Sequence, residues 1–289
     1  MANTKRKITR SKVNNVIVHI ILAVLSLIWV APILWVIMTS FRPEKGAYPT
    51  SFFPKTWTLA NYEKLFTDTA VFNFPRWFGN TFVVAVFSCI LSTIFLVCIA
   101  FCMSRLRFKM RKPFLNVALI LGMFPGFMSI MAVYYIMKGL NLLNGPLKLV
   151  ALVLLYSGGS GILNFYVAKG FFDTIPKTID EAAYVDGASK WHVLTRITIP
   201  LSKPIIIYTI LTSFIAPWID FILSKVIIGT ESKYYTVAIG MWNMLERENV
   251  YQWYTTFFAA AVIVSIPVAI IFLLMQRYYT DGMAGAVKG

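Results

Sequence analysis

The stretch Thr178–Pro204 reads TIDEAAYVDGASKWHVLTRITIPLSKP, and it decides how the rest of the chain is interpreted. It is polar and charged, yet it lies between two long apolar runs. Thr178 and Glu181 have the T-x-x-E spacing of a capping box, which predicts that a helix begins here. Ala182 and Ala183 favour a helix, and their small side chains would let a partner surface approach closely.

Glycine and proline predict where the helices of this stretch end. Gly187 can adopt the left-handed conformation that ends a helix, because it has no Cβ. A second helical segment is then expected from Ser189 toward Ile199, until Pro200 and Pro204 disrupt it. A simpler interpretation is a well-capped surface helix in which Glu181 makes only local hydrogen bonds.

The overall composition indicates a membrane protein. The chain is 58% hydrophobic and 13% charged, with a mean hydropathy of +0.70, which lies outside the range of soluble proteins. A spanning helix needs about 20 mainly apolar residues. Apolar runs predict six spans at about 16–38, 79–103, 114–137, 148–168, 204–228 and 256–276. We expect an all-α bundle of six transmembrane helices forming a single domain over 1–289, with loop 169–203 between spans four and five. The first run is interpreted as a retained helix, because no small-residue cleavage site follows it.

Basic residues predict the orientation, since they concentrate on the cytoplasmic side of membrane proteins. They cluster before span one, between spans two and three, in loop 169–203 and after span six: Lys5, Arg6, Lys7, Arg10, Lys12; Arg105, Arg107, Lys109, Arg111, Lys112; Lys169, Lys177, Lys190, Arg196, Lys203; Arg277, Lys288. Both termini and the loop are therefore expected in the cytoplasm. The net charge of +15 fits topology and attraction to anionic lipid better than nucleic-acid binding.

The same loop carries a family signature. Glu181-Ala182-Ala183, Asp186-Gly187-Ala188 and Ile199-Pro200-Leu201 resemble the EAA motif of the membrane-spanning subunits of bacterial ABC importers, roughly EAAxxDGA, a spacer and LP. The resemblance implies a short cytoplasmic helix that docks in a cleft of a separate ATPase and carries its motion into the membrane. The residues it implies for this coupling are Glu181, Ala182, Ala183, Asp186, Gly187, Ala188 and Pro200. Ile199 replaces the usual Leu, and Leu194 stands where an aromatic residue is common.

Further passages are similar to maltose-type carbohydrate permeases, including their second subunit. They are Gly170–Pro176, Phe53-Pro54 with Thr58–Tyr62, Asn141–Asn144, and the ending Asp281–Gly289. This resemblance implies a bacterial cytoplasmic-membrane permease that imports a sugar such as a malto-oligosaccharide. Its implied partners are a second permease subunit, two cytosolic ATPase subunits that bind ATP and Mg, and an extracytoplasmic sugar-binding protein. In that family the tail can reach between the ATPase subunits, which implies contacts for Gly285, Lys288 and Gly289.

Span five contains an acidic residue. Asp220 follows Pro217 and Trp218, and ionisable groups within membranes usually face a cavity or a partner. We expect Trp218 and Asp220 on the substrate path, where a carboxylate could accept sugar hydroxyls and an indole could stack on a sugar ring. Alternatively, Asp220 pairs with Lys225 or caps a helix break. A different class of function, an ion-coupled secondary carrier, would use Asp220 as its ion site.

Motifs of catalysis are missing from the sequence. It has no G-x-x-x-x-G-K-[ST], no H-E-x-x-H and only two histidines, His19 and His192. Its cysteines, Cys89, Cys98 and Cys102, have no accompanying cluster of histidines or carboxylates. We therefore expect no catalytic residue, no metal site and no cofactor in this chain.

Overall fold

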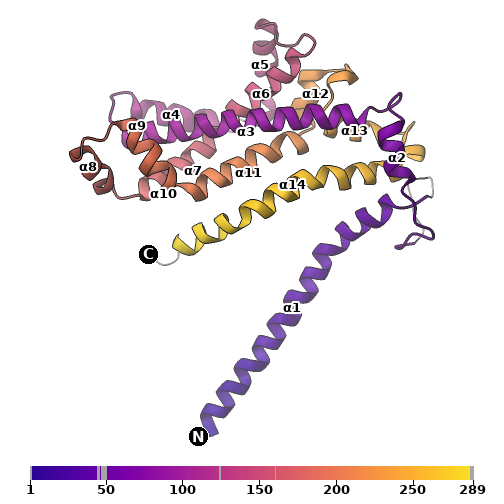
Figure 1. Ribbon diagram of the computed structural model, residues 1–289, viewed down its shortest axis with the longest axis horizontal. Helices are drawn as coiled ribbons and strands as arrows, with labels where there is room; N and C mark the ends of the chain where they lie inside the picture. The colour runs from indigo at the N-terminus through magenta and orange to yellow at the C-terminus, as the bar shows by residue number, and fades with distance from the viewer. Residues whose placement is uncertain (1, 44–45, 47–50, 124, 160, 287–289) are drawn as a thin grey trace. The chain divides into compact units, whose positions relative to one another are not determined.

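The computed structural model describes residues 2–43, 46, 51–123, 125–159 and 161–286, and all regular secondary structure in these ranges is helical (Figure 1). The predicted all-α class is confirmed. Contacts divide the chain into two compact units. Unit 1 comprises Met1–Asp68 and Met244–Ile263, and unit 2 comprises Thr69–Asn243 and Val264–Gly289. The single membrane domain over 1–289 stays a prediction.

Unit 1 contains α1 (Ala2–Ser40), α2 (Ala60–Thr67) and the first part of α14 (Val250–Ala286). Asn61 joins these segments, since its side-chain amide donates to the carbonyls of Ser40 at 2.9 Å and Arg42 at 2.7 Å. The Thr255 hydroxyl donates to the Asn61 Oδ1 at 2.9 Å. Because Asn61 is buried, each of these polar groups has its hydrogen bond satisfied inside the protein.

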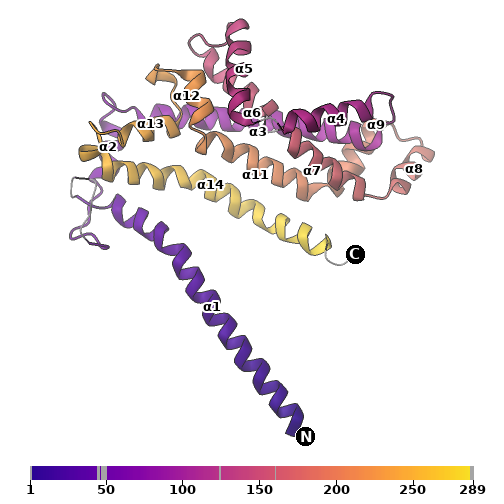
Figure 2. The ribbon, with the colours of Figure 1, turned by 180° about the vertical axis from the view of Figure 1, so that it is seen from behind.

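Unit 2 is built around α3 (Phe74–Arg105), which packs against α6 (Leu147–Gly159), α7 (Gly161–Thr174) and α11 (Lys203–Ile219). Helices α3 and α11 lie side by side in both views (Figures 1 and 2). The Ser213 hydroxyl of α11 donates to the Ser92 Oγ of α3 at 3.0 Å. Such small polar residues let membrane helices approach closely and bond across their contact. The other elements of the unit are α4 (Arg111–Gly122), α5 (Gly126–Gly139), α8 (Lys177–Val185), α9 (Lys190–His192), a π-helix (Val193–Thr198), α10 (Ile199–Leu201), α12 (Ile222–Ile228), a 3₁₀-helix (Ser232–Tyr234) and α13 (Val237–Met244), whose last residue belongs to unit 1.

Within the described ranges, three helices are long and apolar enough to cross a membrane: Asn15–Ser40, Phe74–Arg105 and Val250–Gln276. They coincide with predicted spans one, two and six. The pair Lys190–Leu201 and Lys203–Ile219, bent by 80°, passes the same test together. Its second helix covers most of predicted span five.

Predicted span three is broken near its middle. Helix α4 ends at Gly122 and α5 begins at Gly126, with Pro125 as its N-cap residue. A proline has no N–H to continue the helical ladder, so the sequence forms a break there. Helix α6 ends at Gly159 and α7 begins at Gly161, and residue 160 between them lies outside the described residues. Span three is not one continuous helix, and the number of six spans stays a prediction.

The start of α3 contacts α13 and the 3₁₀-helix that precedes it. The Trp77 indole N–H donates to the Ser232 carbonyl at 3.1 Å, and the Thr81 hydroxyl accepts from the Val237 amide at 2.9 Å. Gly240 of α13 lies directly on the Trp77 ring, where a Cβ would come within 1.9 Å of a ring carbon. A glycine is therefore required at position 240 by the close approach of the two helices.

Candidate functional site

The polar loop forms a short helix, α8, that begins directly after Pro176. Pro176 is the N-cap residue, and no side chain caps the helix. The Ile179 amide donates to the Pro176 carbonyl at 3.2 Å, so Thr178 already lies inside the first turn. The predicted capping box of Thr178 and Glu181 is therefore wrong. The physical reason is that Pro176 cannot continue an earlier helix, and the new helix starts as soon as the chain passes it.

The predicted end of α8 at Gly187 is confirmed. Gly187 has φ +84°, and its amide donates to the Tyr184 carbonyl at 3.1 Å. The Ala188 amide donates to the Ala183 carbonyl at 2.9 Å. These two bonds make a Schellman motif, in which a left-handed residue satisfies the last carbonyls of a helix.

The outer face of α8 is open to solvent. Glu181, Ala182, Asp186 and Gly187 are exposed, and the Glu181 carboxylate makes no hydrogen bond or ion pair to any described residue. Apolar side chains surround these residues, since Val185 is 88% exposed and Trp191 is 69% exposed. Exposed apolar surface bordered by polar groups is typical of a protein interaction site.

The inner face of α8 packs against the rest of unit 2. Ala183 and Ala188 are half-buried and contact a hydrophobic cluster formed by α3, α7 and the loop itself. The buried members of this cluster are Leu96, Val97, Ala100, Phe101, Ala168, Phe172, Val193, Leu194 and Ile205. The structure thus separates the predicted coupling residues into two groups: Ala183 and Ala188 face inward, and the others, including Pro200, are exposed.

Polar contacts that the sequence reasoning missed also fasten the loop to α3. Asp180, next to Glu181, is buried and forms an ion pair with Arg105, the last residue of α3. Ser104 donates to Asp173 Oδ1 at 2.6 Å, and Lys169 contacts Asp173 Oδ2 at 2.5 Å. Burial raises the pKa of the Asp173 carboxyl, but the hydrogen bonds from Lys169 and Ser104 outweigh it and hold that pKa below its ordinary value.

The loop returns to the membrane helices through a bent arm. Ser189 caps α9 by accepting from the His192 amide at 3.2 Å, and the arm continues through the π-helix and α10. The chain bends by 80° at Ser202, between Pro200 and Pro204. Pro204 has no N–H to donate to the carbonyl four residues earlier, so the helix cannot continue straight. The predicted second helical segment is confirmed, but the expected disruption at Pro200 is wrong, because Pro200 lies inside α10 and the helix continues to Leu201.

Asp220 lies at the break between α11 and α12. Its Oδ2 accepts from the Tyr156 hydroxyl at 2.7 Å, the Ser224 amide at 2.9 Å and the Ser224 hydroxyl at 3.1 Å. It therefore caps the start of α12, one of the alternatives open at the sequence level. Lys225 lies 5.0 Å from the centre of the Tyr235 ring, and the described residues show no ion pair between Lys225 and Asp220. Helix α11 passes Pro217 and ends only at Ile219.

Trp218 is packed inside unit 2. Its side chain is 3% exposed, and its ring lies 5.2 Å from that of Phe78 and 5.9 Å from that of Phe214, between centroids. Its indole N–H has no hydrogen-bond partner among the described residues. Buried indole donors usually find a partner, so this unpaired N–H is an exception.

The C-terminal tail was expected to follow a span that ends near residue 276. Helix α14 instead continues to Ala286, so Gly285 is part of a helix. Lys288 and Gly289 lie outside the described residues. Pro267 is inside α14, and the helix is continuous through it.

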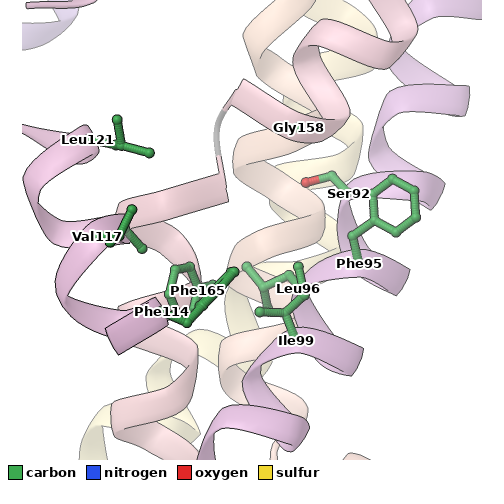
Figure 3. Close-up of a pocket in the computed structure, with 10 residues that line it drawn as sticks. Ser92, Phe95, Leu96, Ile99, Phe114, Val117, Leu121, Gly158 and Phe165 are labelled. Atoms are coloured by element: carbon green, nitrogen blue, oxygen red, sulfur yellow. The ribbon is translucent and has the colours of Figure 1, made fainter. Parts of the chain in front are cut away.

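An apolar cavity of about 210 Å³ lies within unit 2. Leu96 of α3, Phe114 of α4 and Phe165 of α7 meet in it (Figure 3). Among the described residues that line it, Ser92 has the only polar side chain, and its Oγ already accepts from Ser213. A sugar needs several donors and acceptors at defined places, so this cavity does not suit one.

The chain is similar to known transport proteins. Residues 97–285 match the family described as binding-protein-dependent transport system inner membrane component. The chain is 35% identical to the galactooligosaccharides transport system permease protein GanQ of Bacillus subtilis, covering 94% of each chain. It is 30% identical to the maltodextrin transport system permease protein MdxG of the same organism, covering 97% of this chain and 99% of that protein. It is 33% identical to the maltose/maltodextrin transport system permease protein MalG of Vibrio vulnificus, covering 94% of this chain and 95% of that protein.

A solved structure shows the same fold. The chain superposes with a TM-score of 0.74 on a chain from the crystal structure of a bacterial ABC transporter involved in import of the acidic polysaccharide alginate. The match covers 93% of this chain and 97% of that one, at 22% sequence identity. The family match and the relatives above show that the protein is a multi-pass component of an inner membrane. The chain belongs to the family of binding-protein-dependent transport system inner membrane components.

Proposed function

We propose that the chain is a permease subunit of an ATP-driven importer for a neutral oligosaccharide. The relatives described above are permeases for galactooligosaccharides and maltodextrins, which are uncharged sugars of several units. Membership of the family makes it a transport protein rather than an enzyme. The comparisons give no support to an ion-coupled secondary carrier with Asp220 as its ion site.

The exposed face of α8 is the observation that supports this proposal most strongly. It presents an exposed carboxylate, Glu181, beside small and apolar side chains, on a helix whose inner face is fixed to unit 2. A permease has no ATP-binding motif of its own, so it needs such a surface for a separate ATPase. We propose that Glu181, Ala182, Asp186 and Gly187 contact the ATPase. We also propose that Ala183, Ala188 and Pro200 hold this surface in shape.

The remaining partners follow from the same proposal. A second permease subunit would complete the pathway, and two ATPase subunits would bind ATP and Mg. An extracytoplasmic protein would deliver the sugar. Loop 169–203 and both termini would lie in the cytoplasm, because the basic residues gather there. The experiment is to purify the chain with these partners and measure ATP hydrolysis. Stimulation by the binding protein loaded with maltotetraose or galactotetraose supports the proposal, and no stimulation by any oligosaccharide opposes it.

We place Trp218 and Asp220 on the sugar path, with the free indole N–H of Trp218 as a donor to a sugar hydroxyl. Asp220→Asn should keep unit 2 folded, because asparagine caps a helix almost as well as aspartate. Uptake should fall about tenfold, the size expected when a hydrogen bond to a charged group is lost. Ser224→Ala is the control, since it removes one hydrogen bond to the carboxylate but keeps the carboxylate and its charge. Unchanged uptake of several sugars by Asp220→Asn, at normal expression, removes Asp220 from the path.

The tail gives a separate prediction. We propose that Gly285, Lys288 and Gly289 reach between the two ATPase subunits, where small residues fit a narrow cleft. Deleting 283–289 leaves the apolar segment Val250–Gln276 intact, so membrane insertion should be normal. ATPase retention during purification and stimulated hydrolysis should both fall. A truncated protein that retains all of its ATPase and its transport would show that the tail has no such contact.

A further inference from the structure

Arg105 and Asp180 form a buried ion pair between two elements far apart in the sequence. Arg105 is the last residue of α3, and Asp180 lies in the first turn of α8. The Arg105 Nε is 3.1 Å from the Asp180 Oδ2, and the two side chains are 3% and 7% exposed. Two charges taken out of water at this depth require each other, because either one alone would be left uncompensated.

Arg105 also holds the residue that precedes α8. Its Nη2 donates to the Ile175 carbonyl at 3.0 Å. Since Pro176 is the N-cap of α8, one guanidinium contacts both the segment leading into the helix and its first turn. The guanidinium is planar and rigid, so its hydrogen bond to Ile175 and its charge contact with Asp180 together hold both sides of the helix start against the end of α3.

The bonding of the pair is incomplete. The Arg105 Nε and Nη1 and the Asp180 Oδ1 have no hydrogen-bond partner among the described residues. The contact at Nε is therefore a charge contact rather than a well-aligned hydrogen bond. Apolar side chains of similar volume would attach α8 at least as firmly, and the hydrophobic cluster beside it already does so. Stability alone does not account for a charged pair here, whereas a requirement for orientation does.

The two neighbouring acids of α8 lie on opposite faces of the helix. Asp180 faces inward to Arg105, while Glu181 is exposed on the outer face. Helix α3 runs from this point through unit 2 to the segment that contacts α13 (Figures 1 and 2). A force on the outer face of α8 can therefore reach the end of α3, the longest helix of unit 2, through this charged contact as well as through the hydrophobic cluster.

We infer that Arg105 and Asp180 are a positioning pair that transmits the movement of α8 to α3. The inference rests on the proposed function and adds to it the contact through which ATPase motion enters the membrane helices. Without the pair, α8 would still dock on the ATPase, but it would pivot on the hydrophobic cluster. ATP would then be hydrolysed with little transport.

The test replaces the pair by apolar residues of similar volume, Arg105→Met with Asp180→Leu. This double variant leaves no buried charge unpaired, so it should fold and retain the ATPase. The complex is reconstituted in liposomes with the binding protein and labelled maltotetraose or galactotetraose, and sugar transported per ATP hydrolysed is measured. We expect that ratio to fall by roughly fivefold or more, the size of a typical coupling between sites. Asp180→Glu, which keeps both charges but lengthens the carboxylate, should lower the ratio as well.

The control is Lys148→Met, which breaks another partly buried ion pair of unit 2, with Glu231 near the end of α12. It should lower the melting temperature and leave sugar transported per ATP unchanged. A normal ratio in the double variant or in Asp180→Glu overturns the inference. Failure of the double variant to assemble also overturns it, because the pair would then be structural. A wild-type complex without stimulated hydrolysis counts against the proposed function instead, which separates the two failures.

Discussion

Gly240→Ala is expected to prevent unit 2 from folding stably. A Cβ at position 240 would lie 1.9 Å and 2.3 Å from two carbons of the Trp77 ring. The ring cannot move aside, because Trp77 is buried, donates to the Ser232 carbonyl and lies beside Phe72 and Tyr235. Overpacking of a core costs about 1–3 kcal/mol and sometimes more. We expect a loss near the top of that range, and little monodisperse protein.

The measurement is the yield and the thermal midpoint of the purified chain in detergent. Gly79→Ala is the matched control, since Gly79 is two residues from Trp77 in the same helix and a Cβ there would meet no atom within 4 Å. Replacing Trp77 by Leu in the Gly240→Ala background should recover part of the stability by opening space. A normal midpoint for Gly240→Ala would contradict the close approach of α3 and α13.

Gly187→Val is expected to uncouple transport while leaving a folded protein. Gly187 has φ +84°, where a residue with a Cβ is strained by about 1–2 kcal/mol. No atom of the chain lies within 4 Å of a Cβ built there, so the variant meets no internal clash. The strain should disturb the Schellman end of α8, and the added bulk lies on the proposed ATPase contact. Uptake should fall about tenfold, a change of about 1.4 kcal/mol in the coupling.

Binding-protein-stimulated ATP hydrolysis and uptake are measured together in the assembled complex. Gly187→Ala separates strain from bulk, because it adds the Cβ without the branch. Gly170→Val is the control, since Gly170 is helical and a Cβ there would also meet nothing within 4 Å. Normal stimulated hydrolysis and normal uptake in Gly187→Val would contradict the proposed docking of α8.

Local backbone chemistry explains what the sequence could predict. Gly187 ends α8, and Pro204 follows the bend at Ser202, because these residue types restrict the backbone wherever they occur. The helix start predicted from Thr178 was wrong for a related reason. A T-x-x-E pattern shows a possible cap, but Pro176 two residues earlier already sets the helix start. Pro176, rather than the T-x-x-E pattern, therefore determines where α8 begins.

Tertiary contacts explain what the sequence could not predict. Asp180 and Glu181 are adjacent acids, and nothing local shows that the first is buried against Arg105 and the second is exposed. Arg105 was assigned to a cluster of basic residues that indicates topology, although its position at the end of a span was a signal that it could reach the loop. The close contact of Gly240 with Trp77 could not be predicted, because the two residues are far apart in the sequence.

Hydropathy averages over the break in the predicted third span. A window of about 19 residues stays apolar across Pro125, although the helix is interrupted there. The apolar runs could therefore be located from composition, while the continuity of each helix depends on single residues.

The most direct test of the account is the energy source of transport. The chain is reconstituted in liposomes with its partner permease and ATPase subunits, and the binding protein is added outside with labelled maltotetraose or galactotetraose. ATP and Mg enclosed with the ATPase should drive accumulation, and a proton or sodium gradient without ATP should drive none. Accumulation driven by an ion gradient in the absence of ATP, and lost in Asp220→Asn, would contradict the account.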